Sequence, residues 1–306
     1  MGIDQRMQQW LESSRQKFFE SDYKELDKEL TPEGRTEWNS IYASYRSGAL
    51  LHGTVIGVEK IAAPSMDSAE GDDDGPDGIT CIVVVPYRVK ILIPEPLIWW
   101  PGEERESFLL NHMGGANVDF VIIAVDRLNE FAIASRVRAM DRRRWQMTRV
   151  ERLQAGDITS CEILSVGPGL LTMSCHGFDY TVTQSGLSYS CLGDLRSVYR
   201  PGQRLKAKVI AVDEGNLEIS VKDAAPDPYI GAEYRHPVGS TRLATIISKY
   251  KGGVFARLTD GCTVVCRYAR QFEDSQFRPE DIVNVEITSY MEGRKWLRGK
   301  IKGKIG

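Results

Sequence analysis

The first 47 residues place apolar side chains at helical spacing. An initial run comprises Met7, Trp10, Leu11, Phe18 and Leu26, with acidic and basic residues between them. We therefore predict a helical prefix over residues 1–48 that docks on the segment following it.

A second helix of the prefix begins at Thr31-Pro32-Glu33, which supplies a cap residue and a first-turn proline. Its apolar stripe is aromatic and falls at i, i+3, i+4 and i+7, and Gly48 follows as a C-terminal cap. We interpret the stripe as a packing surface. It consists of Trp38, Ile41, Tyr42 and Tyr45.

From residue 50 the hydrophobic period changes to two, which predicts short strands. In the first block these are Leu51–Val58, Ile79–Val85, Arg88–Ile93, Asn117–Val125 and Glu130–Arg136, with a short helix at Glu103–Met113. An acidic insertion at 64–78 contains too few apolar residues to fold and is interpreted as a hairpin tip. It lacks the alternating ligands and closing Glu of a calcium loop, so we predict no metal there.

Three strand-rich blocks resemble one another along the chain. Two of them close alike, with Val121–Asp126 leading to Phe131–Arg136 and Val209–Asp213 leading to Leu217–Lys222. The blocks span 49–137, 155–224 and 238–306, and a basic helical linker (138–154) and a hinge (225–237) join them. Each block has the size of a five-stranded OB-type barrel. The predicted fold is therefore mainly β, with three tandem five-stranded OB-type barrels behind an α-helical prefix.

The charge is distributed unevenly over the 306 residues. The whole chain has a formal charge of −3, but residues 235–306 carry 14 basic and 7 acidic side chains, a net charge of +7. This asymmetry suggests a polyanionic partner for the last block. The alternative is a solvated basic tail over Arg294–Lys304. We favour a polyanion because Tyr250, Phe255, Tyr268, Tyr290 and Trp296 are interleaved with the cations, as in proteins that bind unpaired nucleotides.

Several functional classes have no support in the sequence. No apolar run approaches the roughly 20 residues of a bilayer helix, and residues 1–10 are polar, so we expect a cytosolic protein without a membrane partner. Phosphate-binding loops, nucleophile elbows and paired metal-binding histidines are absent, so we expect neither catalysis nor a cofactor. The six cysteines lack zinc-ribbon spacing and are interpreted as buried thiols. A zinc site from Cys161, Cys175, His176 and Cys191 remains an alternative without a supporting spacing.

Two segments resemble a known family. Residues 132–139, followed by Trp145, Leu153 and Gly156, resemble the exit strand and linker between successive S1 domains, the RNA-binding OB-fold of ribosomal small-subunit protein S1. Residues 246–258, with Asp260-Gly261, resemble the central glycine-aromatic motif of that family. The resemblance covers roughly residues 50–304 and is most specific in the linker and the last block. It implies OB barrels that bind single-stranded RNA.

The resemblance places the expected site on the last block. Tyr250 and Phe255 are expected to stack on bases. The expected phosphate contacts are Lys249, Lys251, Arg257 and Arg267, and Tyr268 is a further candidate for nucleic-acid binding. A weaker surface in the second block would comprise His176, Phe178 and Tyr180. The first block has its acidic insertion where the motif would fall, so we expect competence for RNA to rise toward the C-terminus.

The expected partner is single-stranded RNA, with single-stranded DNA as an alternative ligand. For each aromatic residue, packing in the barrel core is the competing interpretation. A different class of function is also open, because OB barrels bind proteins and the first two blocks are acidic. In that alternative the chain is a scaffold whose helical prefix docks on a ribosome, polymerase or phage-type complex.

Overall fold

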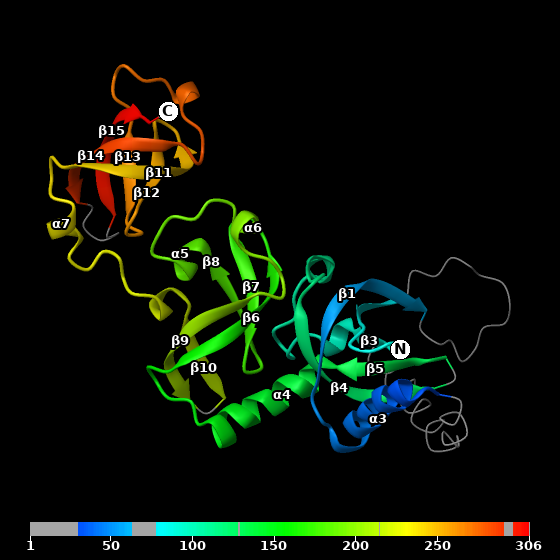
Figure 1. Ribbon diagram of the computed structural model, residues 1–306. Coiled ribbons are helices and arrows are strands. Elements are labelled where there is room, and N and C mark those ends of the chain that lie inside the picture. Colours follow the sequence, from blue (N-terminus) through cyan, green and yellow to red (C-terminus); the bar gives the residue numbers. More distant parts are fainter. Residues whose placement is uncertain (1–29, 63–77, 128, 214, 291–295, 306) are drawn as a thin grey trace.

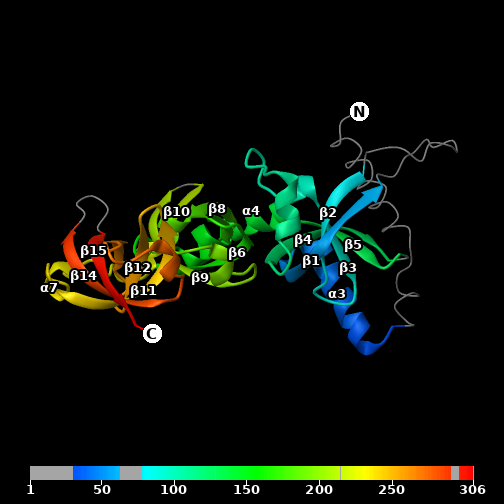
Figure 2. The same cartoon turned by 90° about the horizontal axis from the view of Figure 1, so that it is seen from above.

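The computed structural model describes residues 30–62, 78–127, 129–213, 215–290 and 296–305. Three strand-rich units follow one another in a row, and a long helix lies at the junction of the first two (Figures 1 and 2). The predicted fold class is confirmed: the chain is mainly β, with three five-stranded sheets. Within the described residues no helix has the length and apolar character needed to cross a membrane.

Helix α3 (Pro32–Ser47) confirms the second predicted helix of the prefix. The Thr31 hydroxyl accepts a hydrogen bond from the Gly34 amide at 3.2 Å, and Gly48 ends the helix with φ 66°. Trp38 and Ile41 are buried against the first barrel. The aromatic stripe is thus a packing surface, as predicted. The first predicted helix, from Met7 to Leu26, lies outside the described residues.

The first unit is a closed barrel with strand order β1-β2-β3-β5-β4. Its strands are β1 (Leu51–Ala62), β2 (Gly78–Val84), β3 (Lys90–Pro94), β4 (Asn117–Asp126) and β5 (Phe131–Ser135). All five predicted strands are present with small changes at their ends. The predicted helix at 103–113 is shorter: a 3-10 helix, η3 (Ser107–His112), follows another, η2 (Glu95–Leu97). Most of the acidic insertion lies outside the described residues.

The second unit has the same strand connectivity but is open along one seam. Its strands are β6 (Ile158–Val166), β7 (Leu170–Cys175), β8 (Phe178–Thr183), β9 (Arg204–Asp213) and β10 (Asn216–Ser220), in the order β10-β9-β6-β7-β8. Backbone pairing therefore does not close this sheet, because no described β8 residue pairs with β10. The Tyr180 hydroxyl bridges this seam instead, donating to the Leu217 carbonyl at 2.5 Å. Short helices α5 (Gln184–Leu187) and α6 (Leu195–Val198) precede β9.

The linker between the first two units is helical, as predicted. It consists of α4 (Arg136–Gln146), which continues into a π-helical turn, η4 (Met147–Glu151). After the second unit, η5 (Lys222–Ala224) and α7 (Ala232–Arg235) form the connection to the last barrel.

The third unit is again a closed barrel, in the order β11-β12-β13-β15-β14. Its strands are β11 (Thr241–Tyr250), β12 (Gly253–Leu258), β13 (Thr263–Arg267), β14 (Ile282–Tyr290) and β15 (Leu297–Lys304), with η6 (Asp274–Gln276) before β14. Alternate residues such as Val254, Ala256 and Val264 fill the core. Their neighbours on the same strands therefore form the outer face.

Candidate nucleic-acid interface

A bulge at one position of the first strand aligns the three units. The register shifts between Val55 and Gly57 in β1, between Ile163 and Ser165 in β6, and between Ile246 and Ser248 in β11. In each unit, the first paired residue after the bulge faces one residue of the second strand. These equivalent residues are Val83, Thr172 and Phe255, respectively.

These equivalent positions differ in exposure. Val83 is 3 % exposed and packs with Cys81 and Leu92. Thr172 is 1 % exposed, and Arg105 of the first unit reaches its hydroxyl at 3.3 Å. Phe255 is partly exposed on the outer face of β12. Of these three positions, only the one in the third unit therefore presents an accessible aromatic ring.

Tyr250 lies beside Phe255 because Gly253 has no side chain. The two ring centroids are 5.1 Å apart, and the Tyr250 hydroxyl donates to the Cys266 carbonyl at 3.1 Å. A Cβ on Gly253 would lie only 2.5 Å from the Tyr250 hydroxyl oxygen, inside van der Waals contact. Glycine at this position therefore leaves room for the tyrosine ring to lie across the strand. The hydrogen bond to the Cys266 carbonyl holds the ring there.

Trp296, just before β15, extends the aromatic row. Its ring meets Phe255 edge to face, with the centroids 5.6 Å apart. Tyr250, Phe255 and Trp296 are called the aromatic row below. All three rings are partly exposed, so their remaining surface can stack on unpaired bases.

Cations border the aromatic row on the neighbouring strands. In the register of the barrel, Arg267 on β13 lies opposite Gly253 on one side and Lys300 of β15 on the other. Arg298 lies opposite Val265, which itself pairs with Phe255. In the described part of the chain, Arg267, Arg298 and Lys300 are exposed and form no ion pair. They are free to contact phosphates.

The electrostatics of Tyr250 agree with this arrangement. Burial raises the pKa of its hydroxyl, whereas the positive charges of Arg267 and Arg298 act in the opposite direction. Both guanidinium groups are therefore close enough to influence the ring. The pKa stays above its ordinary value of 10.0, so Tyr250 is a neutral stacking surface at physiological pH.

The other predicted residues of the third barrel divide into two groups. Arg257 on β12 and Lys251 in the β11–β12 turn are exposed. In the sequence they lie close to Phe255 and Tyr250, respectively. Lys249, in contrast, binds the Asp274 carboxylate at 2.6 Å and the Phe277 carbonyl at 3.1 Å. Tyr268 donates to Asp274 at 2.6 Å and stacks on Phe277 at 5.3 Å. Lys249 and Tyr268 thus hold the 268–277 loop and are not part of the aromatic row.

The three candidates of the second unit have structural partners. Phe178 is 8 % exposed, with the Arg144 guanidinium 4.1 Å from its ring centroid. Tyr180 closes the β8–β10 seam. His176 contacts Thr159 at 2.6 Å and Glu151 at 3.1 Å. Burial lowers the His176 pKa, so this side chain is predominantly neutral at pH 7. Phe178 and His176 thus attach the linker to the sheet, and none of the three residues forms an exposed stacking surface.

Three of the linker arginines are likewise engaged within the protein. Arg142 donates to the Gly48 carbonyl at 2.6 Å, and Arg143 donates to the Asp119 carboxylate at 2.6 Å. Arg144 lies 3.7 Å from the centroid of Trp100. These three arginines of the basic linker therefore help to join the first two units.

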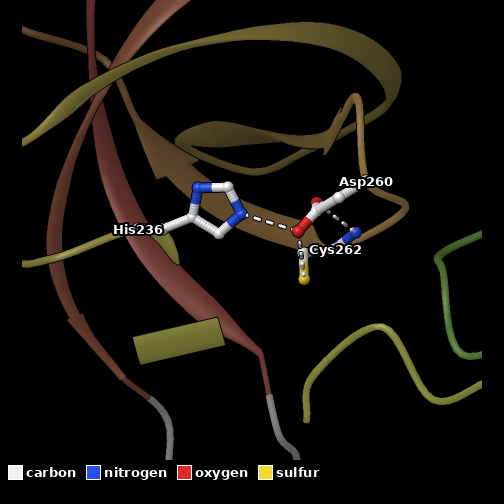
Figure 3. A group of neighbouring side chains, drawn as sticks. All are labelled: His236, Asp260 and Cys262. Atoms are coloured by element: carbon white, nitrogen blue, oxygen red, sulfur yellow. Dashed lines mark hydrogen bonds and ion pairs between the residues drawn. The ribbon is translucent and has the colours of Figure 1, made fainter. Parts of the chain in front are cut away.

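His236, Asp260 and Cys262 come together where the loop after β12 meets the hinge (Figure 3). Asp260 accepts hydrogen bonds from His236 Nε2 at 2.7 Å and from the Cys262 amide at 3.2 Å. These residue types can bind a metal, but Arg235 Nε lies 3.0 Å from the same carboxylate and its charge would repel a cation. Burial raises the pKa of the Cys262 thiol to about 12. We interpret the cluster as a hydrogen-bonded anchor for the loop.

The site predicted from the sequence did not include two cations that the structure places at the interface. Arg298 and Lys300 lie in the basic segment 294–304, for which a solvated tail was the competing interpretation. The parallel pairing of β13 with β15 brings them beside Arg267. Their alternation with Leu297, Gly299 and Ile301 was the available signal, because it predicts one outward-facing row.

Comparisons with known proteins leave the family open. No family model matches the chain. A 4-hydroxy-3-methylbut-2-enyl diphosphate reductase from Clostridium acetobutylicum is 23 % identical over 197 residues, which are 61 % of this chain and 31 % of that protein. The chain thus spans about a third of the length of this curated relative.

Similar solved structures include a multidomain protein with nucleic acid binding domains and a complex that contains rRNA. A multidomain protein with nucleic acid binding domains from Streptococcus pneumoniae is 9 % identical with a TM-score of 0.21, covering 83 % of this chain and 73 % of that one. The a/eIF2alpha-aDim2p-rRNA complex from Pyrococcus horikoshii is 16 % identical, with a TM-score of 0.21 and coverages of 28 % and 52 %.

A third structure is Drosophila Unr CSD456, which is 13 % identical with a TM-score of 0.17 and coverages of 49 % and 63 %. TM-scores this low do not indicate a common arrangement of the whole chains. The function is therefore argued from the barrel surface itself.

Proposed function

We propose that this chain binds single-stranded RNA, without catalysis, through the outer face of its third barrel. Unpaired bases stack on the aromatic row, each contributing about 1–3 kcal/mol. Phosphates contact Arg267, Arg298 and Lys300, with Arg257 and Lys251 at the margins. The observation that carries the proposal is the Tyr250 ring held across Gly253 beside Phe255, with exposed cations on the adjoining strands.

The first two units have a different part in this proposal. Their equivalent surface positions are buried, and Arg142 and Arg143 of the linker have partners inside the protein. They form a connected support that carries the third barrel. The sequence alternative, a protein-binding scaffold, remains the competing function for these units.

Fluorescence anisotropy with labelled RNA tests the proposal. Phe255→Ala is expected to weaken binding of single-stranded RNA by about 5- to 150-fold, because one stacking surface is lost. Tyr234→Ala is the matched control, since Tyr234 is 84 % exposed on α7 of the same region and lies outside the aromatic row. Its affinity is expected to equal that of the wild type. Equal affinities for Phe255→Ala and the wild type would remove the proposed site.

The salt dependence separates RNA binding from scaffold function. RNA affinity is expected to fall by orders of magnitude between low and moderate salt, because phosphate contacts release counterions. A protein contact through apolar surface depends far less on salt. Parallel measurements with single-stranded DNA and with duplex RNA define the ligand class, and preferential duplex binding would contradict stacking on unpaired bases.

A further inference from the structure

A groove of about 750 Å³ lies between the second sheet and the third barrel, a size that accommodates a small ligand or part of a strand. One wall comes from the end of β8, α5 and the loop after it. Trp296 of the third unit lines the opposite side. The residues used below are Thr183, Ser185, Ser188, Tyr189, Lys222 and Trp296.

Hydrogen bonds fix the two walls relative to each other. The Ser190 hydroxyl donates to the Gly261 carbonyl, and the Cys191 amide donates to the Thr263 hydroxyl at 2.8 Å. The Thr263 amide in turn donates to the hydroxyl of Tyr229 in the hinge at 2.8 Å. The groove is therefore preformed at the foot of β13, the strand that carries Arg267 at its other end.

The lining is rich in hydroxyl groups and poor in charge. Ser188 accepts a hydrogen bond from the Ser190 amide at 3.0 Å, which leaves its own hydroxyl hydrogen available to donate. Thr183 and Ser185 hydroxyls lie 3.1 Å apart. Lys222 is the one cation among the described lining residues, and none of them is acidic. Its ammonium lies 5.6 Å from the Tyr189 ring centroid.

The groove is continuous with the aromatic row. Trp296 belongs to both, because its ring contacts Phe255 and also lines the groove. A strand stacked on Tyr250 and Phe255 therefore has a direct path past Trp296. Phosphate attraction by Lys222 and hydrogen bonding by the hydroxyl wall suit a sugar-phosphate backbone.

We propose that the groove holds the nucleotides next to those stacked on the aromatic row, and that its hydroxyl wall binds ribose 2′-hydroxyls. The 2′-hydroxyl is both donor and acceptor and distinguishes RNA from DNA. The groove would thus supply a preference for RNA that stacking alone does not give. This inference rests on the proposed function, since it extends the same strand from the aromatic row.

The test compares oligouridylate with oligodeoxyuridylate, which differ only at the 2′ position. Lengths of about 4 and about 12 nucleotides both fall within the site sizes of OB folds, which run from about 4 to 16 nucleotides. Two groove variants of the full chain are used: Ser185→Trp, which fills the groove from an exposed position, and Lys222→Glu, which repels phosphate. The controls are Ser185→Thr, which keeps the hydroxyl and leaves the groove open, and Lys206→Glu, an equal charge change on exposed β9 surface.

Both groove variants are expected to bind the short RNA like the wild type. The factor by which RNA affinity rises from the short to the long oligonucleotide is expected to fall at least tenfold in these variants. Their RNA-to-DNA affinity ratio is expected to approach one. The controls should retain both properties. Thermal melting checks that Ser185→Trp folds.

Phe255→Ala separates the two proposals. If it weakens binding while the groove variants keep the wild-type length gain and RNA preference, the groove inference is overturned and the proposed function stands. If Phe255→Ala leaves the affinity unchanged at both lengths, the proposed function fails and the groove inference fails with it.

Discussion

Arg136 in the first turn of α4 forms a bidentate ion pair with Asp179 on β8. The Nη1–Oδ2 and Nη2–Oδ1 distances are 2.7 and 2.6 Å, and the two side chains are 3 % and 2 % exposed. Arg136 Nη1 also donates to the Ile98 carbonyl of the first unit at 2.9 Å. One guanidinium therefore connects the first barrel, the linker helix and the second sheet.

Removal of this guanidinium should separate the first two units. Arg136→Ala leaves the Asp179 carboxylate buried without its partner, and loss of one member of a buried pair costs about 3–5 kcal/mol. Urea denaturation followed by tryptophan fluorescence measures this loss. Arg138→Ala is the control, because Arg138 is exposed on the same helix. A small and similar loss of unfolding free energy in Arg136→Ala and Arg138→Ala would show that the ion pair does not hold the junction.

Gly253→Ala is expected to abolish most RNA binding without removing an aromatic ring. The added Cβ would overlap the Cys266 carbonyl and the Tyr250 hydroxyl, so the ring must leave its position. Gly303→Ala on β15 is the matched control, since nothing lies within 4 Å of its Cβ position. Anisotropy measurements at low salt give the affinities. Wild-type affinity for Gly253→Ala would mean that the Tyr250 position is unimportant for binding.

Arg267→Gln should reduce the salt dependence of RNA binding. Each phosphate contact to a single strand contributes about 0.7 to the slope of log affinity against log salt. The slope is therefore expected to become shallower by about 0.7, and affinity at low salt should fall for all RNA sequences alike. A titration across salt concentrations measures it. An unchanged slope would place Arg267 away from the phosphates.

Substitutions in the second unit should affect stability and leave RNA affinity unchanged. Phe178→Ala removes a buried ring and is expected to cost about 3–5 kcal/mol. Phe178→Leu preserves most of the packing, so it permits RNA binding to be measured on a folded protein. Unchanged affinity is expected, whereas weaker binding by Phe178→Leu would restore the second unit as an RNA surface.

The stability of the first unit should depend on pH through His52 and Asp119, whose side chains are 3.0 Å apart. The hydrogen bond to Asp119 raises the His52 pKa above 6.5. The contribution of protonated His52 to stability is therefore complete below pH 6.5 and is lost as the pH rises through the raised pKa. Burial raises the Asp119 pKa, but hydrogen bonds from His52 and Arg143 outweigh it and lower the pKa to about 2. The contribution of the Asp119 carboxylate to stability is present above pH 3.8 and is lost as the pH falls toward 2.

Melting temperatures of the wild type and His52→Gln should therefore differ most near pH 5 and converge at alkaline pH. An NMR titration measures the His52 pKa directly. A value at or below 6.5 would contradict the interaction with Asp119.

The sequence by itself determined the features that depend on neighbouring residues. Thr31, Pro32 and Gly48 mark the ends of α3, because caps act within one helical turn. The alternation of apolar residues predicted the five strands of the first unit and the closing pair of the second. Tyr250 and Phe255 were predicted from the resemblance to the glycine-aromatic motif and from the cations interleaved with them. They lie close together because β11 and β12 form a hairpin with a short turn.

Only the tertiary structure decided which of these side chains are available to a ligand. Arg298 joins the interface through a parallel strand pair with β13, and Lys249 is taken up by Asp274. Phe178 has the same aromatic chemistry as Phe255, yet it lies under Arg144. Strand periodicity assigns a residue to one face of a sheet. Which other segment covers that face depends on contacts between residues far apart in the chain, and local pattern does not contain them.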